Sequence, residues 1–179
     1  RCSTFPIINK LLEMTSGNSD VVNKMNLNKL VNDYFSSMVN QSKLSSSLKA
    51  NILTILGVIC KFHPEFMLKY SKKCLSLFLD ILKVEMSSKN AKPDFNVIAG
   101  SLEGLNNYLF NFTQSAEEGS EHARTIFNYT KQALLSNTDD VTRYAMPRTA
   151  LDLLAKHAEQ FDEYIFEEYQ DLFERILQW

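Results

Sequence analysis

The 179-residue sequence has the composition of a single globular domain, with 45% hydrophobic and 22% charged residues. Five glycines and four prolines provide too few turns for a β-sandwich or barrel, and no apolar run is long enough to cross a membrane. Three cysteines without a CxxC pair argue against a disulfide framework and against a zinc ribbon. We therefore expect an all-α protein of a reducing compartment.

The net charge of -2 conceals an asymmetry along the chain. Residues 1–92 carry 13 Lys or Arg against 6 Asp or Glu, a net +7, and residues 93–179 carry 6 against 15, a net -9. Such a division can steer an extended partner to one end of a molecule. It can equally record solvent-exposed faces that are unevenly charged.

Apolar residues recur at helical spacing from one end of the chain to the other. A short helix is predicted over about 5–14, and the stripes that follow lie at 27–38, 48–62, 67–81, 98–112, 126–134, 144–158 and 161–176. Breaks are expected at His63-Pro64, where the residue before proline avoids helical geometry, and in the polar stretches 87–95, 114–122 and 136–140. The pattern predicts about eight helices and no strand.

Three of these helices begin at similar intervals. With starts near Ser46, Asp94 and Val141, the intervals are about 48 and 47 residues, close to the window of HEAT and armadillo repeats. Stacked helix pairs would also accommodate Pro147, because neighbouring helices support a helix that contains a proline near its start or at a bend. A closed helical bundle gives the same apolar stripes, so the pattern leaves both architectures open.

Side chains that could perform catalysis are sparse. Cys60 and His63 lie three residues apart and could pair as a thiol and a base, but Cys60 adjoins the apolar stripe and His63 precedes a proline. His122 and His157 have no partners at metal-ligand spacing, and no glycine-rich phosphate loop is present. We therefore assign no catalytic residue, no metal, no cofactor and no small-molecule substrate.

Two further patterns concern how the chain packs and what it contacts. Gly100 and Gly104, four residues apart on a helix, favour the close approach of two helices. The carboxylates of the last helix are expected opposite its apolar stripe, as a solvated face or as a docking face for a basic partner. These carboxylates are Asp162, Glu163, Glu167, Glu168, Asp171 and Glu174.

The lysines of the basic half suggest a contact with phosphate. The candidates for binding the backbone of duplex DNA are Lys61, Lys69, Lys72, Lys73, Lys89 and Lys92. Stacking on bases is not expected, since Phe66, Tyr70 and Phe78 belong to an apolar stripe. The alternative is that these lysines serve solubility alone.

Four segments taken in order carry a resemblance to a known family: VIAGSLEGLNNYLFNFTQSAEE, RTIFNYTKQAL, TRYAMPRTALDLLAKHAEQF and LFERILQW. Together they resemble the N-terminal helical-repeat arm of the DNA-dependent protein kinase catalytic subunits, which belong to the phosphatidylinositol-3-kinase-related kinases. The resemblance covers nearly the whole chain, is weakest over residues 1–22, and differs at surface positions in a way that suggests a distant species.

That resemblance implies that residues 1–179 form one segment of a HEAT-like α-solenoid in a very large nuclear serine/threonine kinase, which acts with the Ku heterodimer in repairing double-strand breaks by end joining. No H-R-D or D-F-G element is present, so the fragment itself is expected to have no catalytic activity. The implied partners are duplex DNA ends, Ku and the rest of the kinase, with no membrane. The alternative is a protein-docking or spacer segment that does not touch DNA.

Overall fold

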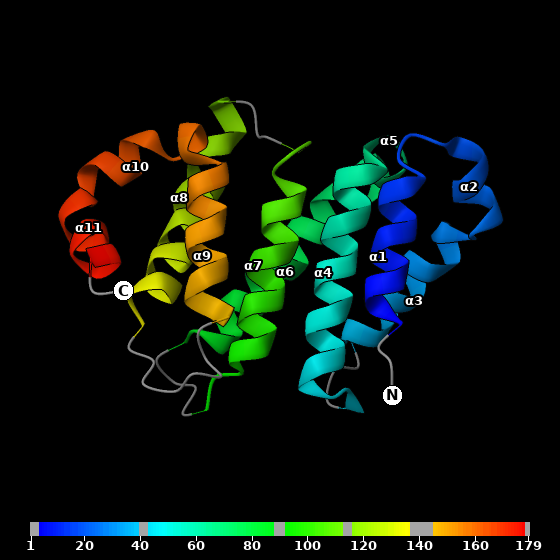
Figure 1. Cartoon of the computed structure of the whole chain (residues 1–179), viewed down its shortest axis with the longest axis horizontal. Coiled ribbons are helices and arrows are strands. Elements are labelled where there is room, and N and C mark those ends of the chain that lie inside the picture. The colour runs from blue at the N-terminus through cyan, green and yellow to red at the C-terminus, as the bar shows by residue number, and fades with distance from the viewer. Residues whose placement is uncertain (1–3, 40–42, 88–91, 113–115, 137–144, 178–179) are drawn as a thin grey trace.

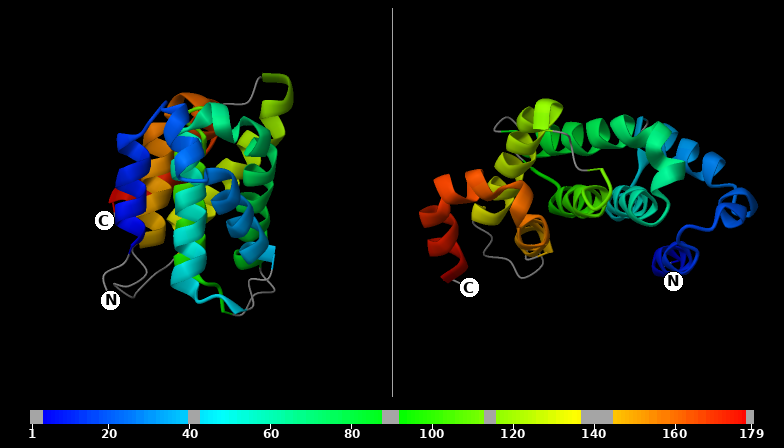
Figure 2. Two further views of the ribbon diagram at one scale, coloured as in Figure 1. Left: turned by 90° about the vertical axis from the view of Figure 1, so that its right-hand side faces the viewer. Right: turned by 90° about the horizontal axis from the view of Figure 1, so that it is seen from above.

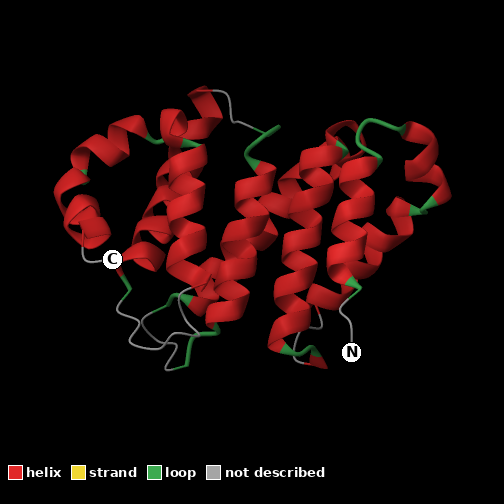
Figure 3. Cartoon of the chain, viewed as in Figure 1, coloured by secondary structure: helices red, strands yellow, loops and turns green. Residues whose placement is uncertain are grey.

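A computed structural model describes residues 4–39, 43–87, 92–112, 116–136 and 145–177, and within these ranges the chain is helical with no strand (Figure 3). The long helices are α1 (Phe5–Met14), α3 (Leu27–Val39), α4 (Ser46–Phe62), α6 (Ser71–Glu85), α7 (Phe95–Tyr108), α8 (Ala116–Leu135), α9 (Ala145–Lys156) and α11 (Tyr169–Leu177). Shorter helices lie between them: α2 (Ser19–Lys24), α5 (Pro64–Met67), η2 (Leu68–Tyr70), η4 (Ala158–Gln160) and α10 (Asp162–Glu167). The all-α prediction is confirmed.

The helices form consecutive antiparallel pairs in two layers. The first layer consists of α1, α4, α7 and α9, which face the viewer in Figure 1, and the second consists of α3, α6 and α8 behind them. Helix α11 contacts α8 and lies at the C-terminal end of the stack, on the side nearer the viewer of Figure 1 (Figure 2). Contacts run from α1 to α4, from α4 to α7 and from α7 to α9, while in the described part of the chain α1 and α9 form no substantial contact. The stack is therefore open, and the solenoid rather than the closed bundle describes it.

Small residues bring two first-layer helices unusually close together. A Cβ added to Gly57 of α4 would lie 2.6 Å from the Cα of Gly104 in α7, and one added to Gly100 would lie 2.6 Å from the Cα of Ala50. The predicted close approach at Gly100 and Gly104 is thus confirmed. The second-layer helices α6 and α8 make only slight contact with each other across the described residues. This difference in spacing curves the stack, with the first layer on the inner side of the arc (Figure 2).

Helices α4 and α7 begin where the sequence predicted, near Ser46 and Asp94. The Ser45 side chain accepts a hydrogen bond from the backbone N–H of Leu48 at the start of α4, and Asp94 accepts one from Val97 at the start of α7, 3.3 Å away. The Ser46 hydroxyl also donates to the Asp94 carboxylate at 2.6 Å, so the cap of α7 is joined to α4. Polar caps of this kind satisfy N–H groups that have no partner within the helix.

Pro147 is the third residue of α9 as the structure describes it, and it is buried. The first residues of a helix have no intrahelical acceptor for their N–H groups, so proline removes no hydrogen bond there. The predicted start at Val141 lies outside the described residues, and described α4, α7 and α9 begin at residues 46, 95 and 145.

Two sequence predictions of element boundaries were wrong. Residues 116–122, expected in a turn, belong to α8. The final stripe, expected as one helix, is divided between α10 and α11 at Glu168, whose backbone N–H still bonds to Tyr164. Apolar periodicity detects only the buried face of a helix. It therefore shows neither the polar first turns of α8 nor the one-residue break between α10 and α11.

The core lies between the layers and runs along the stack, so each pair contributes to it. Among the described residues, no single helix has the length and apolar composition to cross a membrane. The pair Ser46–Phe62 and Pro64–Glu85, which is bent by 117° at its break, meets those criteria only jointly, and its apolar side chains form part of this core.

Candidate functional site

The lysine candidates divide between two edges of the stack. First-layer helices end, and second-layer helices begin, at the upper edge in Figure 1. Lys61 lies in the last turn of α4, while Lys69, Lys72 and Lys73 lie in η2 and the first turn of α6, all at this edge. Lys92 follows α6 at the lower edge, about 20 Å away by the length of that helix. Lys89 lies outside the described residues.

Lys61 is directed away from the other three. Its Nζ lies 4.1 Å from the ring centroid of Phe110, at the end of α7, which is the C-terminal neighbour of α4 in the stack. Lys69 and Lys73 instead reach the N-terminal neighbour, helix α3. The structure therefore does not bring all the candidates into one patch.

We call Lys69, Lys72 and Lys73 the α6 lysine cluster. The Lys69 Nζ donates a hydrogen bond to the Asn28 side-chain oxygen at 3.0 Å, and the Lys73 Nζ lies 4.2 Å from the centroid of the Phe35 ring. Asn28 and Phe35 are seven residues apart, two turns along α3. Cation–π contacts of this type hold a lysine in place without neutralising its charge.

The three lysines of the cluster are exposed, and in the described part of the chain none of them forms an ion pair with a carboxylate. They stand at the N-terminal end of a 15-residue helix. The aligned peptide dipoles of a helix add positive potential at that end, which favours anions. The arrangement is a compact cationic surface.

Sequence reasoning missed the groups on α3 that position this cluster. Tyr70 donates to the Asn28 side-chain oxygen at 2.5 Å, and Lys69 also lies 4.9 Å from the Tyr70 ring centroid. Nothing in the spacing of Asn28 or Phe35 points to α6, because the contact joins residues about forty apart. Phe66 and Tyr70, expected in the core, are only half-buried, whereas Phe78 is fully buried as expected.

The possible thiol–base pair is not assembled for catalysis. Cys60 is fully buried, and contact with the Cys74 thiol, together with burial, raises its pKa. A thiol is nucleophilic as the thiolate, so this environment suppresses reactivity. In the described residues no group of three or more His, Cys, Asp and Glu side chains could hold a metal ion.

The histidines instead join successive first-layer helices. The His63 Nε2–H, at the end of α4, donates to the carbonyl of Leu12 in α1 at 3.2 Å, and His157 donates to the carbonyl of Asn106 in α7 at 2.9 Å. Asn111, three residues beyond the end of α7, makes the equivalent link by donating to the carbonyl of Lys61 in α4 at 2.7 Å. The upper edge thus carries a row of side-chain-to-backbone bonds, one for each junction of the first layer.

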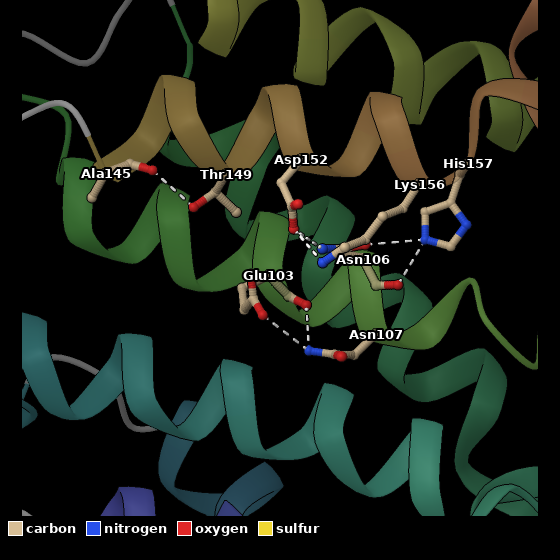
Figure 4. A network of polar contacts seen from close by, with 8 residues as sticks. All are labelled: Glu103, Asn106, Asn107, Ala145, Thr149, Asp152, Lys156 and His157. Carbon is tan, nitrogen blue, oxygen red and sulfur yellow. Dashed lines mark hydrogen bonds and ion pairs between the residues drawn. The ribbon is translucent and has the colours of Figure 1, made fainter.

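Figure 4 shows the junction of α7 and α9 in detail. The Asn106 amide donates to Asp152 at 2.9 Å, and Asp152 also pairs with Lys156. Gln160 lies 3.4 Å from the His157 Nδ1, so that nitrogen accepts while Nε2 donates, as in neutral imidazole. Burial lowers the pKa of His157, and Lys156 and Lys61 lower it further against the opposing effect of the Asn106 carbonyl. These residues fasten α7 to α9.

Comparison with known proteins identifies the family of the chain. The family model described as DNA-PKcs, N-terminal, matches residues 1–179. The chain belongs to the DNA-PKcs N-terminal family. It is 36% identical over 170 residues to the DNA-dependent protein kinase catalytic subunit of Xenopus laevis and 33% identical over 170 residues to that of Mus musculus, in each case 95% of this chain. The Dictyostelium discoideum protein of the same name is 25% identical over 138 residues, or 76% of this chain and 3% of its own length.

The DNA-PKcs relatives are far longer than this chain, which spans 4% of the length of the Xenopus and mouse proteins. The match falls in the N-terminal region of the family, so these 179 residues do not include the kinase domain. The resemblance found in the sequence is confirmed at the level of the family.

Proposed function

We propose that this chain is a non-catalytic helical-repeat scaffold of a nuclear DNA-dependent protein kinase, which takes part in non-homologous end joining by helping to position DNA ends together with the Ku heterodimer. Membership of the DNA-PKcs N-terminal family supports the parent role. The observation that carries the DNA contact is the α6 lysine cluster, three exposed cations at a helix N-terminus that form no ion pair with any carboxylate among the described residues.

The proposed contact is with the phosphate backbone of duplex DNA. Lys69 and Lys73 are held against α3, so less side-chain entropy is lost when they meet phosphates than for freely rotating lysines. Lys72 and the helix N-terminus add to the same positive surface. Half-buried Tyr70 and Phe66 are occupied by contacts with Lys69, so we expect no stacking on bases and no sequence preference.

Fluorescence anisotropy of a labelled blunt duplex, titrated with the chain at two low salt concentrations, tests this contact. Three phosphate contacts predict that log K falls against log salt with a slope of about -2.7. The double variant Lys72→Glu/Lys73→Glu should weaken binding at least tenfold at the lower salt concentration and flatten the slope.

A matched control is the variant Lys43→Glu/Lys83→Glu, which changes the net charge equally. Lys43 and Lys83 are exposed, and Lys83 lies in the last turn of α6, away from the cluster. If the control weakens binding as much as the cluster variant, net charge and not this surface is responsible. No binding by the unchanged protein at low salt would leave the chain as a spacer or docking segment.

A further inference from the structure

A shallow groove crosses the inner side of the stack over α4, α7 and α9. One part of it, of about 340 Å³, lies between α4 and α7, and a second part, of about 640 Å³, lies between α7 and α9. The two parts adjoin, because Glu103 and Thr149 line both of them. Helix α4 packs between α1 and α7, and α7 packs between α4 and α9. The groove therefore belongs to the middle of the stack, and we call it the inner groove.

A row of polar side chains on α4 lines the first part of the inner groove. Ser47, Asn51 and Thr54 follow one another in steps of four and three residues, the spacing of one helix face. In the part of the chain that the structure describes, their side chains form no hydrogen bond with the protein. Ala50 and Gly100 lie beside them, and such small residues leave the polar groups accessible. Hydroxyl and amide groups both donate and accept, so they complement a peptide backbone, which presents N–H and C=O groups in alternation.

Two charges of opposite sign in the inner groove have no counter-ion among the described residues. Glu103 is half-buried where the two parts meet, and its carboxylate accepts a hydrogen bond from the Asn107 amide at 3.3 Å but forms no ion pair there (Figure 4). Arg148 of α9 is exposed in the second part and likewise forms no ion pair within the described chain. Asp152, by contrast, is already paired with Lys156. Glu103 and Arg148 are therefore the charges that a ligand would meet.

We propose that the inner groove binds an extended peptide segment that carries an arginine and, on the same face, an acidic residue. The guanidinium pairs with the Glu103 carboxylate, whose geometry it matches, and the acidic side chain pairs with Arg148. The peptide backbone pairs with Asn51 and Thr54. A helical ligand satisfies its own backbone groups and gains nothing from these side chains, and nucleic acid offers no cation to Glu103. The complementary charges and backbone groups therefore favour an extended peptide.

The test uses a labelled ten-residue peptide that repeats arginine, serine, glutamate and serine, titrated with the full chain by fluorescence anisotropy. Residues two apart in an extended chain share a face, so this arginine peptide presents both charges to the groove. Glu103→Gln should weaken its binding about tenfold, as expected for the loss of a charge-assisted hydrogen bond. A peptide with glutamine in place of arginine should bind more weakly, and should bind Glu103→Gln as well as it binds the unchanged protein. Arg148→Gln should weaken the arginine peptide but not a peptide with glutamine in place of glutamate.

The matched control is Asp80→Asn, which removes one exposed carboxylate charge from α6 in the other layer. This control should bind the arginine peptide within twofold of the unchanged protein. The proposal is overturned if Asp80→Asn and Glu103→Gln lose affinity alike, if the arginine and glutamine peptides bind equally, or if the unchanged protein binds neither. It is also overturned if light scattering shows a dimer that Glu103→Gln dissociates and that excludes the peptide, since the occupant would then be a second copy. Circular dichroism of each variant shows whether the fold is retained.

Discussion

Replacing Gly57 by alanine separates two opposing effects on the stability of the stack. Alanine is the better helix former by about 1 kcal/mol, so α4 alone would gain from the change. The added Cβ, however, would lie 2.6 Å from both the Cα and the carbonyl oxygen of Gly104, where ordinary contact begins at 3.4 Å. Both contacts are with backbone, so no side chain can move aside, and α4 and α7 must separate.

Overpacking of this kind costs about 1–3 kcal/mol, and a clash with backbone belongs in the upper part of that range. After the gain in helix propensity, Gly57→Ala should lower the free energy of unfolding by about 1–2 kcal/mol. Urea denaturation followed by far-UV circular dichroism measures this difference. Ser76→Ala, at an exposed position of α6, is the control and should change stability by no more than about 0.5 kcal/mol. Unchanged or increased stability of Gly57→Ala would refute the close approach of α4 and α7.

Three further predictions concern other junctions of the stack. Asp94→Ala removes the cap of α7 and its bond to Ser46, so urea denaturation should show a loss of about 1 kcal/mol; Asp94→Asn, which keeps an acceptor, should lose less. Burial lowers the pKa of His63 and His157 below 6.5, so below that pH the unfolded chain binds more protons than the folded chain. The free energy of unfolding should therefore be constant above about pH 6.5 and fall as the pH drops toward the folded pKa values. Thermal melts from pH 7.5 to about pH 5 that show no such fall would contradict this prediction. Arg175→Ala removes two hydrogen bonds from α11 to the carbonyls of Leu134 and Ser136 at the end of α8, so amide hydrogen exchange should become faster in α11 and stay unchanged in α4. Equal exchange rates in α11 before and after the substitution would show that Arg175 does not anchor α11 to α8.

Sequence patterns were informative about the fold where burial decides structure. The apolar stripes of α4 and α7 are long and regular, and both helices end or begin at residues with a clear local cause, such as Pro64 and Asp94. The last helix shows the limit of the same reasoning. Tyr169, Phe173 and Ile176 share an apolar stripe with Leu172, yet only Leu172 is buried and the other three face solvent. The stripe is wider than the contact with α8, and the sequence pattern of such a stripe is the same as that of one that is fully covered.

The candidate sites depended more on tertiary contacts than on spacing. The sequence placed Lys61 with the lysines of α6, and the structure separates them because Lys61 turns toward Phe110 and Lys73 toward Phe35. Neither ring is near its lysine in the chain. The six carboxylates of the last helix were expected opposite its apolar stripe, but three of them, Glu167, Glu168 and Asp171, form ion pairs with Arg124 and Lys131 of α8. The residue spacing within one helix cannot predict such contacts with another helix.

The unequal spacing of the first layer also bears on the mechanics of the stack. A solenoid deforms joint by joint, since each pair touches only its neighbours. Between α4 and α7 the glycines bring backbone against backbone, and this joint has the most extensive contact of any two elements. Between α7 and α9 a groove lined by Glu103, Arg148 and Asp152 opens on the inner side, and contact is less extensive. Under load the centre should move as a stiff block while bending concentrates at the joint with α9, so the C-terminal pair would swing relative to the lysines of α6.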